Sequence, residues 1–397
     1  MASTTAPEPT PEPAVHATHV ERRDGFVQIH VAGGSYEMGL QHGEMLRDEI
    51  RSLLDAVHHH VLYGQPGVVG WGMRRGARSV ARLMEPFIPR RHRLEMAGVA
   101  MAAGVDYRDI LLVNCFDDVL ANLRIIAAAF GRLGCSAFAA NARPDADDEL
   151  VAGRNLDYFV TSAAGDDLWA ATDYMKRHVI VAEHTPTEGS RFASVGWPGF
   201  VGVATGMNEA GMVASALVVA TVRNKPLATP APFLYRRIVE ETSRIEEAVA
   251  ILRRSPRSQG HNLLLASADD RSAAVVEYTP WRMAIRRPEN GWISTTNHFV
   301  DPEMARRYAQ FEVLSSTDRL ARLGDMCSSD GLTRGDLISA RRYLLDTEIR
   351  SPNADEYCTI FNPCTIYSTL FAPQSRRMWV RVADQPDRTF EAVDVGS

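Results

Sequence analysis

The chain has 397 residues, of which 45% are hydrophobic and 23% are charged, so it can bury a large core as one big domain or two. Its formal net charge of −6 is modest and no basic stripe appears, which excludes nucleic acid as an expected partner. No apolar run is long enough for a membrane span, and the five cysteines are odd in number and irregularly spaced, which disfavours a disulfide framework or a zinc site. No metal or other cofactor is predicted, and a homo-oligomer is compatible with this composition.

Residues 1–25 are rich in Pro, Thr, Ala and Glu, with no apolar run behind a basic head. This composition predicts a disordered leader rather than a signal peptide. The absence of an export signal, together with the unpatterned cysteines, favours a cytoplasmic location.

The segment 26–134 is predicted to be rich in helix. Residues 26–33 alternate like a strand, and apolar side chains then recur at helical spacing over residues 36–62. Three consecutive histidines, 58–60, lie on this helix, where successive side chains point in different directions, so they cannot present three metal ligands on one face. Cys115, in the apolar stretch DILLVNCFDDVLANL, is expected to be a buried packing thiol.

From residue 135 onwards the pattern changes to strands. Strand-like runs begin with SAFAANA and LVAGRNLDY, and they resume after helical stretches up to the terminal run RMWVRVAD. Strands interrupted by helical blocks predict an α+β protein. The polar segment ARPDADDE between the first two runs predicts a hairpin that returns the second strand to the first.

Gly134 and Cys135 stand at the head of the first of these strands. Cysteine attacks as a thiolate, with an unperturbed pKa of about 8.5, so it needs a base or a positive neighbour near neutral pH. If the Gly134–Cys135 bond were cut, the new α-amine, with a pKa of roughly 8, would lie on the nucleophile's own residue and could be that base. The hairpin would bring Arg154 and Asp157 to Cys135, where a guanidinium could stabilise the thiolate and a carboxylate could hold the amine.

The Gly134–Cys135 junction, the later GRNLDY and the opening GSYEMGLQHG at residues 34–43 together carry a family resemblance. With these motifs the chain resembles the N-terminal-nucleophile (Ntn) cysteine hydrolases of the acyl-CoA:6-aminopenicillanic acid acyltransferase (isopenicillin N acyltransferase-like) family, which is related to the choloylglycine hydrolases. The resemblance extends over residues 30–385. It implies a four-layer αββα sandwich, self-cleavage between Gly134 and Cys135, and a small chain, 26–134, that stays packed with a catalytic large chain, 135–397, as one unit.

Two asparagines match the family's pattern for an oxyanion hole, Asn208 in GMNEAGMVAS and Asn297 in ISTTNHF. The resemblance assigns both to hydrogen bonding the tetrahedral oxyanion, a contact whose loss can cost about 3–4 kcal/mol of transition-state stabilisation. Either residue alone would be interpreted as a turn asparagine. The expected reaction is hydrolysis of a small linear amide, an N-acyl or aminoacyl amine, through a Cys135 thioester. Transfer of the acyl group to an amine acceptor is the alternative, because only the access of water relative to an amine separates the two outcomes.

Other interpretations of the same residues stay open. A papain-like thiol would need a histidine, for which His298 beside Asn297 is the candidate, and the same base would serve a chain that stays uncut. Asn155, Tyr158 and His298 are candidate pocket residues, although the first two could instead point away from Cys135. A non-catalytic homologue that binds a small metabolite is a further alternative, against which the joint presence of all five expected catalytic residues argues.

Overall fold

The computed structural model describes residues 18–23, 25–58, 68–123, 134–141, 149–158, 170–309, 314–329, 337–352, 354–384 and 389–395. Most of the predicted leader, two of the three consecutive histidines and most of the predicted hairpin turn lie outside these ranges. Within them, no helix combines the length and the apolarity that a membrane crossing requires.

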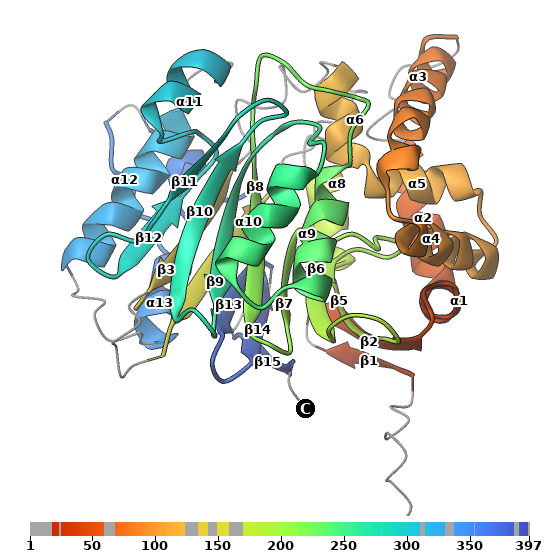
Figure 1. Ribbon diagram of the computed structural model, residues 1–397, viewed down its shortest axis with the longest axis horizontal. Coiled ribbons are helices and arrows are strands. Elements are labelled where there is room, and N and C mark those ends of the chain that lie inside the picture. Colours follow the sequence, from red (N-terminus) through yellow and green to blue (C-terminus); the bar gives the residue numbers. More distant parts are fainter. Residues whose placement is uncertain are drawn as a thin grey trace, which may run out of the picture.

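Two β-sheets form the centre of the molecule (Figure 1). The nine-stranded sheet has the spatial order β1 (His19–Arg23), β2 (Phe26–Gly33), β5 (Ile180–Pro186), β6 (Phe192–Gly196), β7 (Thr205–Asn208), β8 (Met212–Val219), β9 (Gly260–Ser267), β10 (Ser272–Tyr278) and β11 (Met283–Arg286). The six-stranded sheet has the order β12 (Trp292–Thr295), β3 (Cys135–Ala140), β4 (Val151–Asp157), β13 (Thr365–Ala372), β14 (Arg377–Val382) and β15 (Glu391–Asp394).

Helices occupy the N-terminal part of the chain and the long connections between strands. Before β3 the described helices are α1 (Ser35–Met45), α2 (Arg47–Ala56), α3 (Val68–Met84), α4 (Arg90–Ala103), α5 (Tyr107–Asn114) and α6 (Phe116–Leu123), with a 3-10 turn at Glu85–Phe87. After β4 they are α8 (Ala170–Arg177), α9 (Ala231–Glu241), α10 (Ile245–Arg254), α11 (Pro302–Tyr308), α12 (Leu314–Ser329) and α13 (Leu337–Leu344), with a 3-10 turn at Glu356–Cys358.

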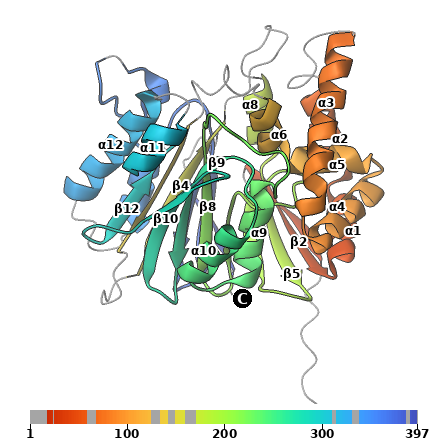
Figure 2. The same cartoon turned by 45° about the horizontal axis from the view of Figure 1, so that its top comes forward.

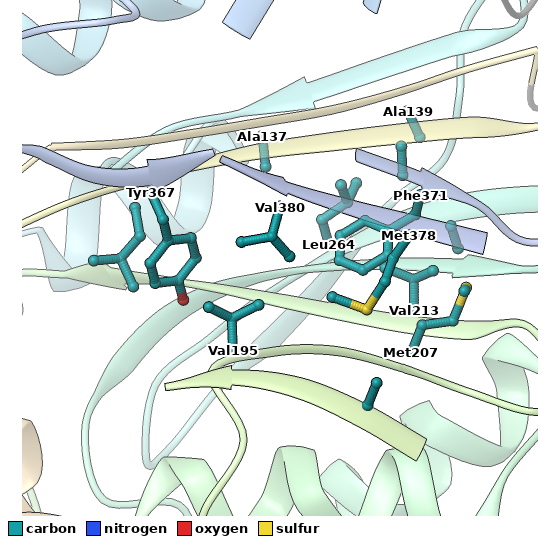
Figure 3. Close-up of a cluster of buried hydrophobic side chains, with 14 of the residues drawn as sticks. Ala137, Ala139, Val195, Met207, Val213, Leu264, Tyr367, Phe371, Met378 and Val380 are labelled. Atoms are coloured by element: carbon teal, nitrogen blue, oxygen red, sulfur yellow. The ribbon is translucent and has the colours of Figure 1, made fainter. Parts of the chain in front are cut away.

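The two sheets pack face to face through an apolar layer. Because side chains alternate between the faces of a strand, Ala137 and Ala139 of β3 face Val195 of β6 and Val213 of β8, all of them fully buried (Figure 3). β13 contributes Phe371 to the same layer.

The outer faces of both sheets are covered by helices (Figures 1 and 2). α9 and α10 pack on the nine-stranded sheet, where Leu263 and Leu265 of β9 contact helix residues such as Ile238. α12 and α13 pack on the six-stranded sheet, where Phe138 contacts Tyr343 edge to face. The result is the predicted α+β architecture, a four-layer αββα sandwich, and this prediction is confirmed.

The helix-rich segment before Gly134 is joined to the rest of the chain in two ways. β2 pairs with β5 in parallel, so this segment supplies the edge of the nine-stranded sheet. In addition, Glu95 of α4 forms a bidentate pair with Arg236 of α9, at 2.7 and 3.0 Å, and His92 contacts Glu240 at 2.9 Å. All four side chains are buried, so the segment shares a desolvated polar interface with the sandwich.

Candidate active site

Cys135 is the first residue of β3 and lies at the end of the hairpin that this strand forms with β4. The two strands pair antiparallel, with Cys135 opposite Leu156 and Ala137 opposite Arg154, which confirms the predicted return of the chain. Arg154 and Leu156 share one face of β4, and Asp157 follows on the other face. The hairpin register therefore brings both predicted partners to the start of β3.

The guanidinium of Arg154 reaches the thiol. Its Nη2 lies 3.7 Å from Sγ of Cys135, and the same group donates to the carbonyls of Ala216 at 2.5 Å and Ala204 at 3.2 Å. The hydroxyls of Thr205 and Tyr367 accept from Nη1. These partners fix a buried cation beside the sulfur.

The thiol itself is not activated in the uncut chain. Burial raises the pKa of Cys135, and the positive charge of Arg154 opposes that rise without cancelling it. A neutral thiol is therefore the resting form near neutral pH, and attack requires a base that removes its proton.

Asn297 holds the backbone nitrogen of Cys135. Its Oδ1 accepts from this N–H at 2.6 Å and also from Nη2 of Arg319 at 3.1 Å, while its Nδ2 donates to the carbonyl of Val218 at 2.9 Å. The structure thus brings Asn297 to Cys135, and its Oδ1 accepts from the nitrogen that a cut at Gly134 would turn into an α-amine.

Asp157 and Arg319 form a charged group around Gly134. The Asp157 carboxylate accepts from Asn362 Nδ2 and from Thr365 Oγ1, each at 2.8 Å. A Cβ added at Gly134 would lie 2.9 Å from Asp157 Oδ2 and 3.2 Å from the Arg319 guanidinium, so only glycine fits there without a shift of neighbouring atoms.

Arg319 was not predicted from the sequence. It is completely buried in α12, and its Nη1 donates to the carbonyl oxygen of Cys135 and, at 3.0 Å, to the hydroxyl of Ser136. No local motif marks this arginine, because it follows Cys135 by 184 residues and resembles any other basic residue of an amphipathic helix.

The charge of Asp157 predicts a pH dependence. Burial raises the pKa of Asp157 to about 6, although Arg319 and two hydrogen bonds favour the ionised form. Because the folded pKa is raised, the residue's contribution to stability is present at low pH and is lost as pH rises through about 6. The negative charge of its carboxylate has the opposite dependence and is lost below about pH 6.

We therefore expect kcat/KM for a substrate without titrating groups to fall below about pH 6 in the wild type. Asp157→Asn should have low activity at every pH, and its pH–rate profile should lack the fall below about pH 6. If the Asp157→Asn profile still shows this fall, another group causes it.

Asn208 requires a correction, because the structure does not bring it to Cys135. Its Nδ2 donates to the carbonyls of Val239 and Thr242 at the end of α9, at 2.8 and 2.9 Å, and its Oδ1 accepts from the N–H groups of Ala210 and Met212 in the turn after β7. The amide is fully used in joining this turn to the helix.

Substitution distinguishes the two asparagines. Asn208→Ala leaves buried backbone groups without partners and is expected to lower the free energy of unfolding by about 2–4 kcal/mol, while kcat/KM of the folded protein stays within about threefold. Asn297→Ala should instead lower kcat/KM. Denaturant titration measures the change in stability, and steady-state kinetics measure the change in kcat/KM. Loss of activity in a well-folded Asn208→Ala protein would show that Asn208 does have a role in the active site.

The three candidate pocket residues lie in different surroundings in the structure. Tyr158 lines a cavity beside Cys135 and donates its hydroxyl to Asp117. Asn155 points away, since its Nδ2 donates to the carbonyls of Leu344 and Ile360 under α13. The His298 ring contacts the Ser316 hydroxyl at 2.8 Å, and burial lowers the pKa of His298 to about 4.

No hydrogen bond joins the His298 ring to Cys135 in the described part of the chain, so the papain-like alternative has no contact that supports it.

The cavity next to Cys135 is lined mainly by apolar side chains from both sides of the Gly134–Cys135 bond. Leu53 and Phe116 come from the helix-rich segment, and Leu156, Trp197 and Phe200 come from the sandwich. Such a concave apolar site with a few polar groups is typical of small-molecule binding. Among the described residues, no group of three or more His, Cys, Asp or Glu could hold a metal ion.

Residues 145–387 match the model of the family described as "Acyl-coenzyme A:6-aminopenicillanic acid acyl-transferase". An uncharacterized protein of Archaeoglobus fulgidus is 26% identical over 318 residues, which cover 71% of this chain and 51% of that protein. Protein dcd1B of Dictyostelium discoideum is 20% identical over 63% of this chain and 49% of its own length. The chain thus spans about half the length of these curated relatives.

Two solved structures resemble the chain more remotely. The Caenorhabditis elegans ortholog of N-acylethanolamine-hydrolyzing acid amidase aligns with a TM-score of 0.45 and 16% identity over 60% of this chain and 93% of its own. A conjugated bile acid hydrolase from Clostridium perfringens aligns with a TM-score of 0.45 and 13% identity, over 65% and 92%. The family match covers more than half of the sequence, and the chain belongs to the acyl-coenzyme A:6-aminopenicillanic acid acyl-transferase family.

Proposed function

We propose that the chain is a self-processing cysteine amidohydrolase, in which Cys135 first cleaves the Gly134–Cys135 bond and then hydrolyses a small linear amide. One observation carries this proposal: the Cys135 sulfur lies beside the Arg154 guanidinium on the wall of an apolar cavity, while the nitrogen of the same residue is held by Asn297.

In the processing step, Sγ of Cys135 attacks the carbonyl carbon of Gly134, and the bond from that carbon to the Cys135 nitrogen breaks. The nitrogen takes the thiol proton and becomes an α-amine, and water then hydrolyses the thioester to leave a carboxylate on Gly134. The position of Asp157 and Arg319 around Gly134, within 2.9 and 3.2 Å of the place that a Cβ would take, supports this step, because both charged groups lie near the bond that breaks. Asp157 is positioned to hold the new amine once it is charged.

In the turnover step, the α-amine accepts the thiol proton and Sγ attacks the amide carbon of the substrate. Asn297 holds the amine through Oδ1, and its second Nδ2 hydrogen is the proposed donor to the oxyanion. The leaving amine takes the proton, and water hydrolyses the Cys135 thioester. Arg154 stabilises the thiolate before it attacks and again when it leaves the acyl carbon.

The segment before Gly134 is proposed to remain as the small chain. Its buried contacts with the sandwich, the Glu95–Arg236 ion pair and the His92–Glu240 hydrogen bond, would be lost if the two parts separated. Its side chains also line the cavity, so the large chain alone would have an incomplete site.

Acyl transfer is the second candidate, because the family description names an acyl-transferase. Both reactions share the Cys135 thioester and differ in whether water or an amine resolves it. A panel of N-acyl amines, with detection of the released amine and of hydroxamate in the presence of hydroxylamine, distinguishes them. Amine release that requires Cys135 supports the amidohydrolase; hydroxamate formation far in excess of hydrolysis favours transfer; and binding without turnover of any amide would favour the non-catalytic homologue.

A further inference from the structure

One carboxylate in the cavity has no part in the chemistry proposed above. Asp117, in the first turn of α6, is half-buried and lines the same cavity as Cys135. Its Oδ1 accepts from the Tyr158 hydroxyl, and no hydrogen bond reaches its Oδ2 in the described part of the chain. A carboxylate with two oxygens has room for several donors, so this group has unused acceptor capacity.

The adjacent residue provides a contrast. Asp118 is fully buried, and its carboxylate accepts from the N–H of Ala231 and from the Ser258 hydroxyl. These contacts join α6 to the start of α9 and to the segment before β9, so Asp118 has a structural role. Asp117 makes a single such contact, with the Tyr158 hydroxyl.

No cation within the described residues forms an ion pair with Asp117. The positive charge of Arg154 acts on Asp117, but that guanidinium is already engaged by two carbonyls and two hydroxyls and lies against the Cys135 sulfur. Burial raises the pKa of Asp117, although the Tyr158 hydroxyl and the positive charge of Arg154 favour its ionised form. A cation placed beside Oδ2 would favour the ionised form further.

A second polar group of the cavity is also incompletely bonded. His261 of β9 is only 3% exposed and lines the cavity, and its Nδ1 has no hydrogen-bond partner in the described part of the chain. Burial and Arg154 lower the pKa of His261 to about 3, so the ring is neutral and one of its nitrogens is an acceptor. Asp117 and His261 therefore lie on two walls of one cavity, and each has a polar atom that makes no hydrogen bond in the described part of the chain.

The rest of the wall suits the same kind of ligand. Tyr174, Trp197 and Phe200 line the cavity, and aromatic faces attract cations as well as apolar groups. Arg154 also lines the cavity, but its guanidinium is engaged by the Cys135 sulfur and by protein carbonyls, whereas an anionic ligand group beside Asp117 would meet a like charge.

We propose that this cavity selects amides that carry an ammonium group, with Asp117 as its counter-ion and His261 as a further acceptor. The inference rests on the proposed amide hydrolysis and names its substrate class. The ammonium group belongs either to the acyl half of the amide or to the amine half, and the two sources are separated by experiment.

The test compares isosteric substrates that differ in one charged group. For the acyl half, β-alanyl and butanoyl p-nitroanilide differ by an ammonium in place of a methyl group. For the amine half, N-butanoyl-ethylenediamine and N-butanoyl-propylamine differ in the same way. The wild type is expected to favour the charged member of one pair by roughly 10- to 100-fold in kcat/KM, the range for a hydrogen-bonded charge.

Asp117→Asn keeps the size of the side chain and the acceptor for Tyr158. This variant should lose most of the preference through a higher KM for the charged amide, while kcat/KM for the neutral one stays within about threefold. Tyr158→Phe is the matched control, because it removes the hydroxyl but keeps the carboxylate, and it should retain the preference. An equal preference in wild type and Asp117→Asn would overturn the inference.

The outcomes separate this inference from the function on which it rests. Hydrolysis of neutral amides that requires Cys135, without a preference for charged amides, would refute the substrate class but would still support the proposed amidohydrolase function. If no amide is hydrolysed, calorimetric binding of the same pairs to Cys135→Ala still decides the inference. Tighter binding of the charged member that disappears in the Cys135→Ala, Asp117→Asn double variant supports it, and equal binding refutes it.

Discussion

Replacement of Cys135 by alanine is expected to lower kcat/KM for amide hydrolysis by on the order of 10³-fold or more, because removal of a covalent nucleophile leaves only binding and the oxyanion contacts. The substitution removes one sulfur atom at the start of β3 and leaves the strand pairing with β4 unchanged. Near-wild-type thermal stability should therefore accompany the loss of activity.

The measurement is steady-state kinetics on the most reactive amide, together with thermal unfolding of each protein. Cys327→Ala is the matched control, since Cys327 is a buried thiol of α12 and does not line the cavity. It is expected to keep its activity. Residual activity above about one tenth of wild type in Cys135→Ala would exclude Cys135 as the nucleophile.

Substitution of Arg154 by lysine has the second largest expected effect. A lysine ammonium cannot satisfy the Ala216 and Ala204 carbonyls and also reach Sγ of Cys135, because it is a compact charge on a flexible stem. A hydrogen bond to a charged group contributes about 1.5–3 kcal/mol, so we expect kcat/KM at neutral pH to fall by roughly 10- to 150-fold. The pKa of the thiol should rise further.

Alkylation of Cys135 by iodoacetamide as a function of pH measures that pKa independently of any substrate. The Arg154→Lys profile should shift to higher pH than the wild-type profile. Arg381→Lys is the control, because Arg381 is another buried arginine of the six-stranded sheet that stacks on Phe361 and does not line the cavity. This variant should change neither the pH profile of alkylation nor kcat/KM. Coincident profiles for wild type and Arg154→Lys would show that this guanidinium does not stabilise the thiolate.

The placement of Arg154 and Asp157 could be predicted because it depends on local structure. A strand, a polar turn and a returning strand fix which residues oppose Cys135, and alternation then places Arg154 on the same face as the thiol. The αββα sandwich was predicted less directly. Periodicity gives only α+β, and the layer order followed from the family resemblance.

The failure at Asn208 has a physical reason in the same alternation. Met207 points between the sheets, so Asn208, one residue further, points to the opposite face and towards α9. The sequence motif shows that an asparagine ends a strand, but the face it occupies depends on how the sheets stack. A shift of one residue in the register of the strand moves the side chain from one face of the sheet to the other.

Arg319 and Asp117 could not be predicted for a different reason. Both lie on helices whose local sequence is an ordinary mixture of apolar and charged residues, and both reach the site through contacts across the fold. Arg319 approaches Cys135 only because α12 packs on the outer face of β3 and β12, and Asp117 only because α6 borders the cavity. No spacing rule connects such residues to Cys135.

Self-cleavage at Gly134–Cys135 is the central claim, since the free α-amine is the base that a buried thiol with a raised pKa requires. Intact-mass spectrometry of purified wild type and Cys135→Ala under denaturing conditions tests it most directly. The account predicts two wild-type polypeptides, the larger beginning at Cys135, that elute together under native conditions, and one uncut polypeptide for Cys135→Ala. An active wild type that remains a single chain would contradict the free-amine mechanism, and cleavage of both proteins would show that the cut is not made by Cys135.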